Sequence, residues 1–187
     1  KVRTNDCDGP ASINNNFTGV GSIGFPVGVV VARTWNKDLA YAFGDSIGKM
    51  ANEMDVSGWY APAMNNHRTT FAGRNFEYYS EDGVLSGYIA EKAVQGSQEN
   101  GVYAYMKHFA LNDQEQNRCD MVCTWSSEQA IREIYLKPFE MCVKDANCLA
   151  VMSSFNYIGN RWAGGSSSLC KTVLRNEWGF KGFVETD

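Results

Sequence analysis

The sequence has 187 residues, of which 44% are hydrophobic and 20% are charged, and its formal net charge is -4. This length is sufficient for one sizeable hydrophobic core and short for two domains. The acidic balance and the lack of a Lys/Arg cluster argue against a nucleic-acid-binding surface. No apolar run reaches the ~20 residues that a membrane span needs.

The first third of the chain alternates between strand-like and helix-like patterns. Residues 25–32 form a continuous valine-rich run, which predicts a strand buried on both faces. Asn36 can cap the helix that follows, and residues 56–61 predict the next strand. In that helix, apolar residues recur at intervals of three and four: Leu39, Phe43, Ile47 and Met50.

Further strands and helices follow in the same alternation. A helix opens at 80–82, whose acidic residues suit the positive N-terminal end of a helix, and residues 102–109 predict a third strand. After a long polar loop (111–124), Ser126 and Gln129 form a capping box for a helix that Pro138 must end or kink. The remaining expected elements are a helical segment to residue 145, a strand at 148–153, a helix at 166–176 and a strand at 182–186.

Strands alternating with helices at this spacing predict βαβ units and a parallel sheet. The long polar loops follow the strands, which favours a barrel with its functional site at the C-terminal rim. The sequence has no GxGxxG motif, so a dinucleotide-binding fold is disfavoured. We expect an α/β fold in which residues 1–187 form one incomplete (β/α) barrel of the TIM type.

The six cysteines form no CxxC pair. The spacing of Cys119 and Cys123, with no histidine nearby, does not suit a zinc site. Reduced, mostly buried thiols are the simplest interpretation, and they favour a cytoplasmic over a secreted protein.

Polar clusters stand where strands of this barrel should end. They are the segment 6–10, the segment 73–77, Lys107 with His108, and Asp187. Each alone has a structural explanation, such as a turn or an ion pair. Together they fall within longer segments that resemble the barrel domain of glycoside hydrolase family 3, the β-glucosidase family and its relatives. These segments are GRNFEYYSED (73–82), KHFALNDQEQNR (107–118), REIYLKPFE (132–140), VMSSFN (151–156) and LRNEWGFKGFVETD (174–187).

The resemblance implies a retaining hydrolase that cleaves terminal non-reducing β-D-glucosyl residues through a covalent glycosyl-aspartate. Asp187 falls on the catalytic nucleophile of the family. Its sugar-hydroxyl-binding positions fall on Asp8, Arg74, Lys107 and His108, and Met152 lines the same subsite. Phe155 stands where relatives commonly have Tyr, a departure that removes a hydroxyl near the nucleophile.

The resemblance also implies that the barrel is incomplete, lacking its first strand region and everything after the nucleophile strand. The general acid/base usually comes from another domain, so we expect it outside this chain and expect the chain alone to be inactive. Glu185 shares the strand of Asp187, but we expect it to point into the barrel wall. We expect Arg118, Glu115 and Asn117 to pin the loop after His108.

The implied partners are a β-linked oligosaccharide or glucoside and the missing domains of the same enzyme, with no cofactor and no metal. Within the family, β-xylosidase or arabinosidase activity is the alternative to β-glucosidase activity. A non-catalytic sugar-binding paralogue, which Phe155 would suit, is a further alternative. Barrel aldolases also place a lysine at a strand end, so a Schiff-base lyase using Lys107 is another.

Overall fold

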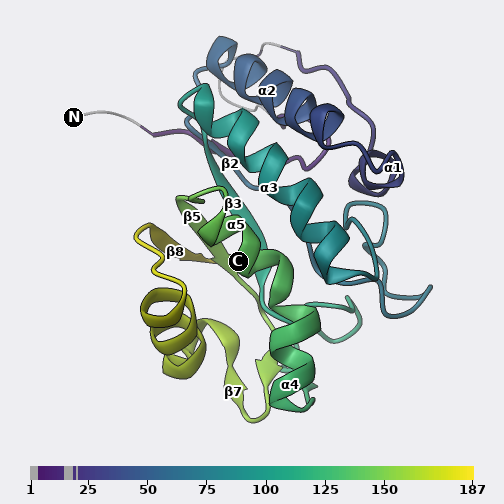
Figure 1. Cartoon of the computed structure of the whole chain (residues 1–187), viewed down its shortest axis with the longest axis vertical. Helices are drawn as coiled ribbons and strands as arrows, with labels where there is room; N and C mark the ends of the chain where they lie inside the picture. The colour runs from purple at the N-terminus through teal and green to yellow at the C-terminus, as the bar shows by residue number, and fades with distance from the viewer. Residues whose placement is uncertain (1–3, 15–18, 20) are drawn as a thin grey trace.

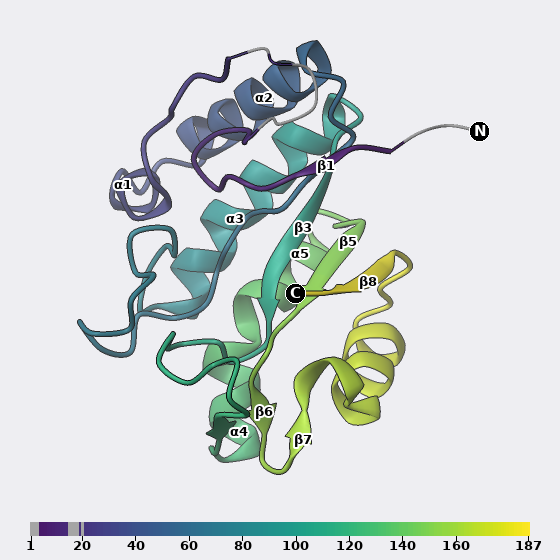
Figure 2. The same ribbon diagram turned by 180° about the vertical axis from the view of Figure 1, so that it is seen from behind.

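The computed structural model describes residues 4–14, 19 and 21–187. At its centre is a curled parallel sheet of five strands in the order β1-β2-β3-β5-β8. Helices cover one face of the sheet (Figure 1), and the view from behind shows the opposite face without such a cover (Figure 2). The strands are β1 (Asp6–Cys7), β2 (Gly58–Trp59), β3 (Tyr103–Phe109), β5 (Ala150–Ser153) and β8 (Phe183–Thr186).

The covering layer consists of stacked helices. Helix α2 packs against α3, α3 packs against α5, and α3 and α5 both contact β3. The helical segments are α1 (Gly28–Arg33), α2 (Lys37–Glu53), α3 (Gly83–Glu99), α4 (Glu128–Ala130), the π-helical η1 (Ile131–Tyr135), α5 (Lys137–Lys144), the 3-10 turn η2 (Ala163–Gly165) and the π-helical η3 (Ser168–Glu177). A small second sheet joins β4 (Cys123–Thr124), β6 (Tyr157–Ile158) and β7 (Arg161–Trp162).

Strand β3 shows how the sheet separates core from site. Ala104 and Met106 belong to the main hydrophobic core beneath the helices. Tyr105 packs on the other face, with Ala150 and Met152 of β5. Because successive side chains of a strand point to opposite faces, Lys107 continues the face of Tyr105. The uncovered face therefore carries the polar groups that end the strands.

The two long helices begin where the sequence predicts. The Asn36 side chain accepts hydrogen bonds from the backbone N–H groups of Asp38 (2.9 Å) and Leu39 (3.1 Å), which caps α2. Asp82 caps α3 through the N–H groups of Val84 and Leu85. These caps satisfy N–H groups that have no partner within the helix.

Two of the expected local features are wrong. Residues 25–32 do not form a strand: the run becomes α1, in which Gly28, Val31 and Ala32 are buried and Val30 is 48% exposed. Buried residues at positions i, i+3 and i+4 are typical of a helix, although the valines favour a strand. The sheet begins instead with β1, a two-residue strand too short to show a pattern. The helix after 124 is capped by Ser127, one residue later than expected, through the Ala130 N–H.

The predicted break at Pro138 is confirmed, since α5 starts at Lys137 with the proline in its first turn. All six cysteines are free, and Cys7, Cys142 and Cys148 are buried. Within the described part of the chain, none of the helices is both long and apolar enough to span a bilayer.

Candidate active site

The carboxyl ends of the parallel strands surround a cavity of about 320 Å³. Six of the seven predicted site residues line it, the exception being Phe155. A cavity of similar volume lies on the outer surface among paired charges such as Arg132 and Glu177, so volume alone does not identify the site. The lining residues are Asp8, Tyr60, Arg74, Lys107, His108, Arg118, Met152, Glu185, Thr186 and Asp187.

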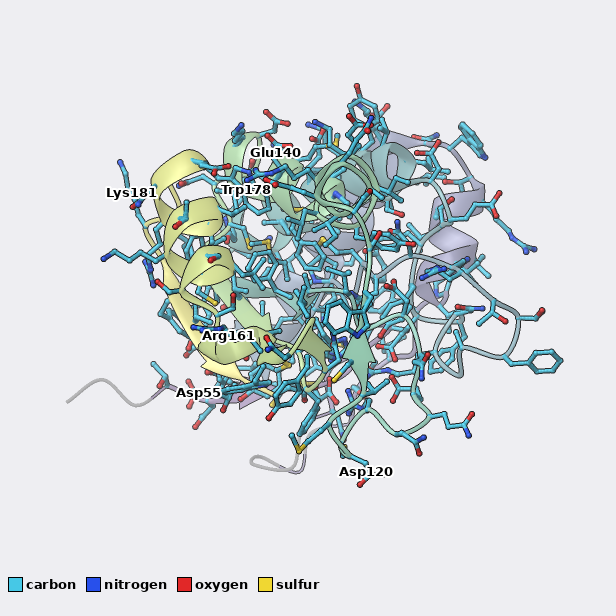
Figure 3. All side chains as sticks on the ribbon, turned by 90° about the horizontal axis from the view of Figure 1, so that it is seen from below. Asp55, Asp120, Glu140, Arg161, Trp178 and Lys181 are labelled. Carbon is cyan, nitrogen blue, oxygen red and sulfur yellow. The ribbon has the colours of Figure 1, made fainter. Side chains whose placement is uncertain are left out.

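The loop after β3 contributes to this cavity from the uncovered side of the sheet. Asp120, in that loop, lies on the side of the molecule opposite to Glu140 of α5 (Figure 3). The peptide bonds Lys107–His108 and Phe109–Ala110 are cis, and the pairing of β3 with β5 shifts register between Met106 and Phe109. The register shift makes the end of β3 irregular beside the cavity.

Asp8 and Lys107 form an ion pair across the end of the sheet. The Lys107 Nζ donates to Asp8 Oδ1 at 2.8 Å; the lysine side chain is 3% exposed and the aspartate side chain 61%. Partial burial acts to raise the pKa of Asp8, but the charge and hydrogen bond of Lys107 outweigh it, and the pKa is lowered. The Lys107 nitrogen is buried and already bonded to Asp8, which disfavours the Schiff-base lyase alternative.

Asp187 follows β8 directly and reaches two basic side chains. Its Oδ2 accepts a hydrogen bond from Arg118 Nη1 at 3.0 Å and lies 3.8 Å from His108 Nε2. Burial, reinforced by the charges of Arg74, Lys107 and Arg118, holds the pKa of His108 well below its ordinary value. The imidazole facing Asp187 is therefore neutral near pH 7.

Arg74 presents a fixed positive charge to the cavity. Its Nε donates to Glu77 Oε1, and Glu77 is itself buried. Burial acts to lower the pKa of Arg74, but the hydrogen bond to Glu77 and the nearby carboxylates raise it above its ordinary value. The Arg74–Glu77 pair thus holds the guanidinium in one place.

Met152 and Phe155 occupy different layers of the site. Met152 lines the cavity, whereas Phe155 lies behind Arg118, whose guanidinium carbon is 4.7 Å from the ring centroid. This stacking is a cation–π contact. Phe155 therefore does not line the cavity and contacts the site by packing against Arg118.

The expectation that Glu185 points into the barrel wall is wrong. Glu185 lines the cavity and pairs with Met152 in the sheet register. Its Oε1 accepts from the Tyr60 hydroxyl at 3.4 Å. Burial, followed by the charge of Asp6, raises the pKa of this carboxyl.

Sequence reasoning missed four residues that line the cavity: Tyr60, Arg118, Glu185 and Thr186. Arg118 was expected only to pin its loop, and it does contact Glu115 (3.1 Å), while the Asn117 carbonyl accepts from the Asp120 N–H (3.0 Å). Strand alternation from Asp187 could have placed Glu185 on the site face. Nothing in the pattern indicates that Arg118 also reaches Asp187.

The comparisons with known proteins agree with this geometry. Residues 14–187 match the family described as "Glycosyl hydrolase family 3 N terminal domain". The chain belongs to glycosyl hydrolase family 3. It is 43% identical to Beta-glucosidase A of Butyrivibrio fibrisolvens over 97% of its length, and 39% identical to Beta-glucosidase B of Emericella nidulans over all of it.

Solved structures of this family share the fold. Beta-glucosidase 3B from Thermotoga neapolitana in complex with glucose superposes on 97% of the chain with a TM-score of 0.92 at 45% identity. Beta-glucosidase from Kluyveromyces marxianus in complex with glucose covers 98% with a TM-score of 0.94 at 35% identity. The curled sheet is thus that of the family's N-terminal domain.

The chain spans only 22% of the length of each of those two curated relatives, and 26% and 22% of those two solved chains. Across residues 4–14, 19 and 21–187, no three His, Cys, Asp or Glu side chains converge as metal ligands would.

Proposed function

We propose that the protein carrying this chain is a retaining β-glucosidase, and that the chain supplies its nucleophile and most of its glucose-binding subsite. The observation that carries the proposal is the position of Asp187. Its carboxylate ends β8 inside the cavity, 3.0 Å from Arg118 and 3.8 Å from His108. Attack by Asp187 on the anomeric carbon breaks the glycosidic bond and forms a glycosyl-aspartate, and the aglycone leaves with a proton from the general acid. Water, which gives a proton to the same group, then displaces Asp187 and releases the sugar with its configuration retained.

The other lining groups suit recognition of sugar hydroxyls. The Asp8–Lys107 pair offers an acceptor and a donor side by side, and Asp8 remains half exposed to a ligand. Arg74 adds a fixed donor, and the neutral His108 adds a further ring nitrogen. Hydrogen bonds to ring hydroxyls that strengthen as the sugar approaches an oxocarbenium-like state lower the barrier.

We place the general acid/base in a segment outside this chain. A general acid must carry a proton, which the lowered pKa of Asp8 disfavours. The pKa of Glu185 is raised, but Glu185 lies two residues before Asp187 on β8, about 7 Å deeper in the strand direction. The same missing segments would complete the TIM-type barrel, and residues 1–187 alone would not hydrolyse ordinary glycosides.

Two alternatives share the same subsite. A β-xylosidase or arabinosidase could use the same subsite residues, but the relatives reported above are named β-glucosidases. A non-catalytic sugar-binding paralogue is favoured only by Phe155, which puts an apolar ring rather than a hydroxyl beside Arg118.

The test is hydrolysis by the full-length protein. We expect kcat/KM for aryl β-glucosides to exceed that for aryl β-xylosides and α-arabinofuranosides, and proton NMR to show β-glucose as the first product. Asp187→Asn should abolish turnover. Formation of α-glucose first would contradict a retaining mechanism, and glucose binding without any turnover would favour the sugar-binding paralogue.

A further inference from the structure

The two arginines of the site share one carboxylate. Arg74 lies in the loop before α3, and Arg118 lies in the loop after β3. Glu115 Oε1 is 3.7 Å from Arg74 Nη1, and Glu115 Oε2 is 3.1 Å from Arg118 Nε. Glu115 therefore bridges two loops that each deliver a cation to the cavity.

Glu115 is itself fixed by contacts with both loops. Its backbone N–H donates to the Ala72 carbonyl at 2.9 Å, and Asn112 Nδ2 donates to its Oε1 at 3.2 Å. Gly73 packs against it with a positive φ of 98°, where an added Cβ would lie 3.0 Å from the Glu115 Cγ. The absence of a side chain at Gly73 thus lets the two loops close on Glu115.

Different nitrogens of the Arg118 guanidinium contact Glu115 and Asp187, and this arrangement has a chemical consequence. Its Nε edge is held by Glu115, and its Nη1 donates to a single oxygen of Asp187, Oδ2. A guanidinium that is free to rotate prefers to bind a carboxylate through two parallel hydrogen bonds. Such a fork on Asp187 would place a hydrogen bond on both carboxylate oxygens and so weaken either one as a nucleophile.

We propose that Glu115 is a positioning residue that restricts Arg118 to one oxygen of Asp187 and so keeps the other oxygen free as the nucleophile. This inference rests on the proposed function, because it assigns a purpose to Glu115 only if Asp187 attacks a sugar. Glu115 acts through Arg118 and does not itself contact the substrate.

The experiment compares three variants of the full-length protein. Glu115→Gln removes the charge that holds Arg118 while keeping the shape, and Glu115→Asp keeps the charge on a shorter side chain. Glu128→Gln is the matched control, because Glu128 pairs with Arg132 at 2.8 Å on an exposed helical surface outside the cavity.

We expect Glu115→Gln to lower kcat for an aryl β-glucoside by about 10- to 100-fold, with KM changed by less than about threefold. Glu115→Asp should recover part of the loss, and Glu128→Gln should stay within about twofold of wild type. If Glu115 had a purely structural role, Glu115→Gln would lower the amount of folded enzyme, but the folded enzyme would keep the kcat of the wild type. Equal kcat values for Glu115→Gln and Glu128→Gln would overturn the inference.

A crystal structure of Glu115→Gln decides the matter independently of activity. We expect the Arg118 guanidinium to turn so that two of its nitrogens contact Asp187. An unchanged single contact would overturn the inference even in an active enzyme. Failure of the wild type to hydrolyse any glycoside would instead refute the proposed function, and the position of Arg118 would still report on Glu115.

Discussion

Asp113 offers a prediction whose sign and size follow from burial. The residue lies in the loop after β3 and is 8% exposed. Its Oδ1 accepts the Asn66 N–H at 2.8 Å, while its Oδ2 has no hydrogen-bond partner among the described residues. Burial raises the pKa of Asp113 to about 6, against the opposing effects of the Asn66 hydrogen bond and the Arg68 charge.

Because its pKa is raised, Asp113 makes the free energy of unfolding depend on pH. The folded state binds this proton more tightly than the unfolded chain, whose reference pKa is 3.8. The carboxyl therefore favours folding at low pH, and this contribution is lost as the pH rises from about 4 through about 6. A shift of about two units corresponds to roughly 3 kcal/mol. Asp113→Asn removes the titration, so its stability relative to wild type should rise by roughly 2 kcal/mol between pH 4.5 and 7.5, because about a third of the effect is already present at pH 4.5.

Hydrogen exchange measured by mass spectrometry can test this in the full-length protein. Wild type and variant are compared at each pH on peptides that cover β3 and residue 113, so the intrinsic exchange rates cancel. Asp120→Asn, at an exposed position of the same loop, is the control and should show no such trend. A difference between Asp113→Asn and wild type that does not change with pH would refute the reasoning.

Three further predictions concern single side chains. Asp8→Ala leaves the buried Lys107 ammonium without its partner, so local stability should fall by roughly 2 kcal/mol and kcat/KM should collapse; retained activity in a glucosidase assay would exclude Asp8 from the subsite. Below pH 6.5 His108 binds a proton in the unfolded chain but not in the folded one. The free energy of unfolding should therefore fall by at most about 1.4 kcal/mol for each unit by which the pH is lowered. Hydrogen exchange measured against pH should show a smaller slope for His108→Gln. Asn36→Ala should weaken α2 by about 1 kcal/mol, seen as faster exchange in its first turn with unchanged kcat; unaltered exchange would show that the cap is dispensable.

The elements that the sequence predicts well are those with a local cause. Helices α2 and α3 have capping side chains, Asn36 and Asp82, at their starts, and Pro138 marks a break that no packing can remove. The valine run at 25–32 fails because β-branched residues favour strands, whereas the packing of Gly28, Val31 and Ala32 against the core, at helical spacing, goes with α1. Strand β1 is two residues long and depends on its pairing with β2.

The site residues show the same difference between positions with a local cause and positions that depend on tertiary contacts. Asp8 and Asp187 directly follow strands and Lys107 lies near the end of β3, so parallel pairing brings the three together once the sheet is assumed. Glu185 depends on the register of β8, and Arg118 depends on the path of a loop of more than ten residues. Such a path is set by contacts like that of Glu115 with Ala72, between positions far apart in the sequence. Arg118 could therefore not be assigned without the structure, whereas strand alternation from Asp187 could have indicated Glu185.

We expect Asp187 to form a covalent bond to glucose, and trapping of this intermediate tests the nucleophile assignment without relying on the general acid. The full-length protein is incubated with an activated 2-deoxy-2-fluoro-β-glucoside, which needs little acid assistance, and then analysed by intact mass spectrometry and peptide mapping. We expect one fluoroglucosyl adduct per chain, located on the peptide that contains Asp187 and absent from Asp187→Asn. An adduct on any other carboxylate, or rapid turnover of aryl glucosides by Asp187→Asn, would contradict the assignment of Asp187 as the nucleophile.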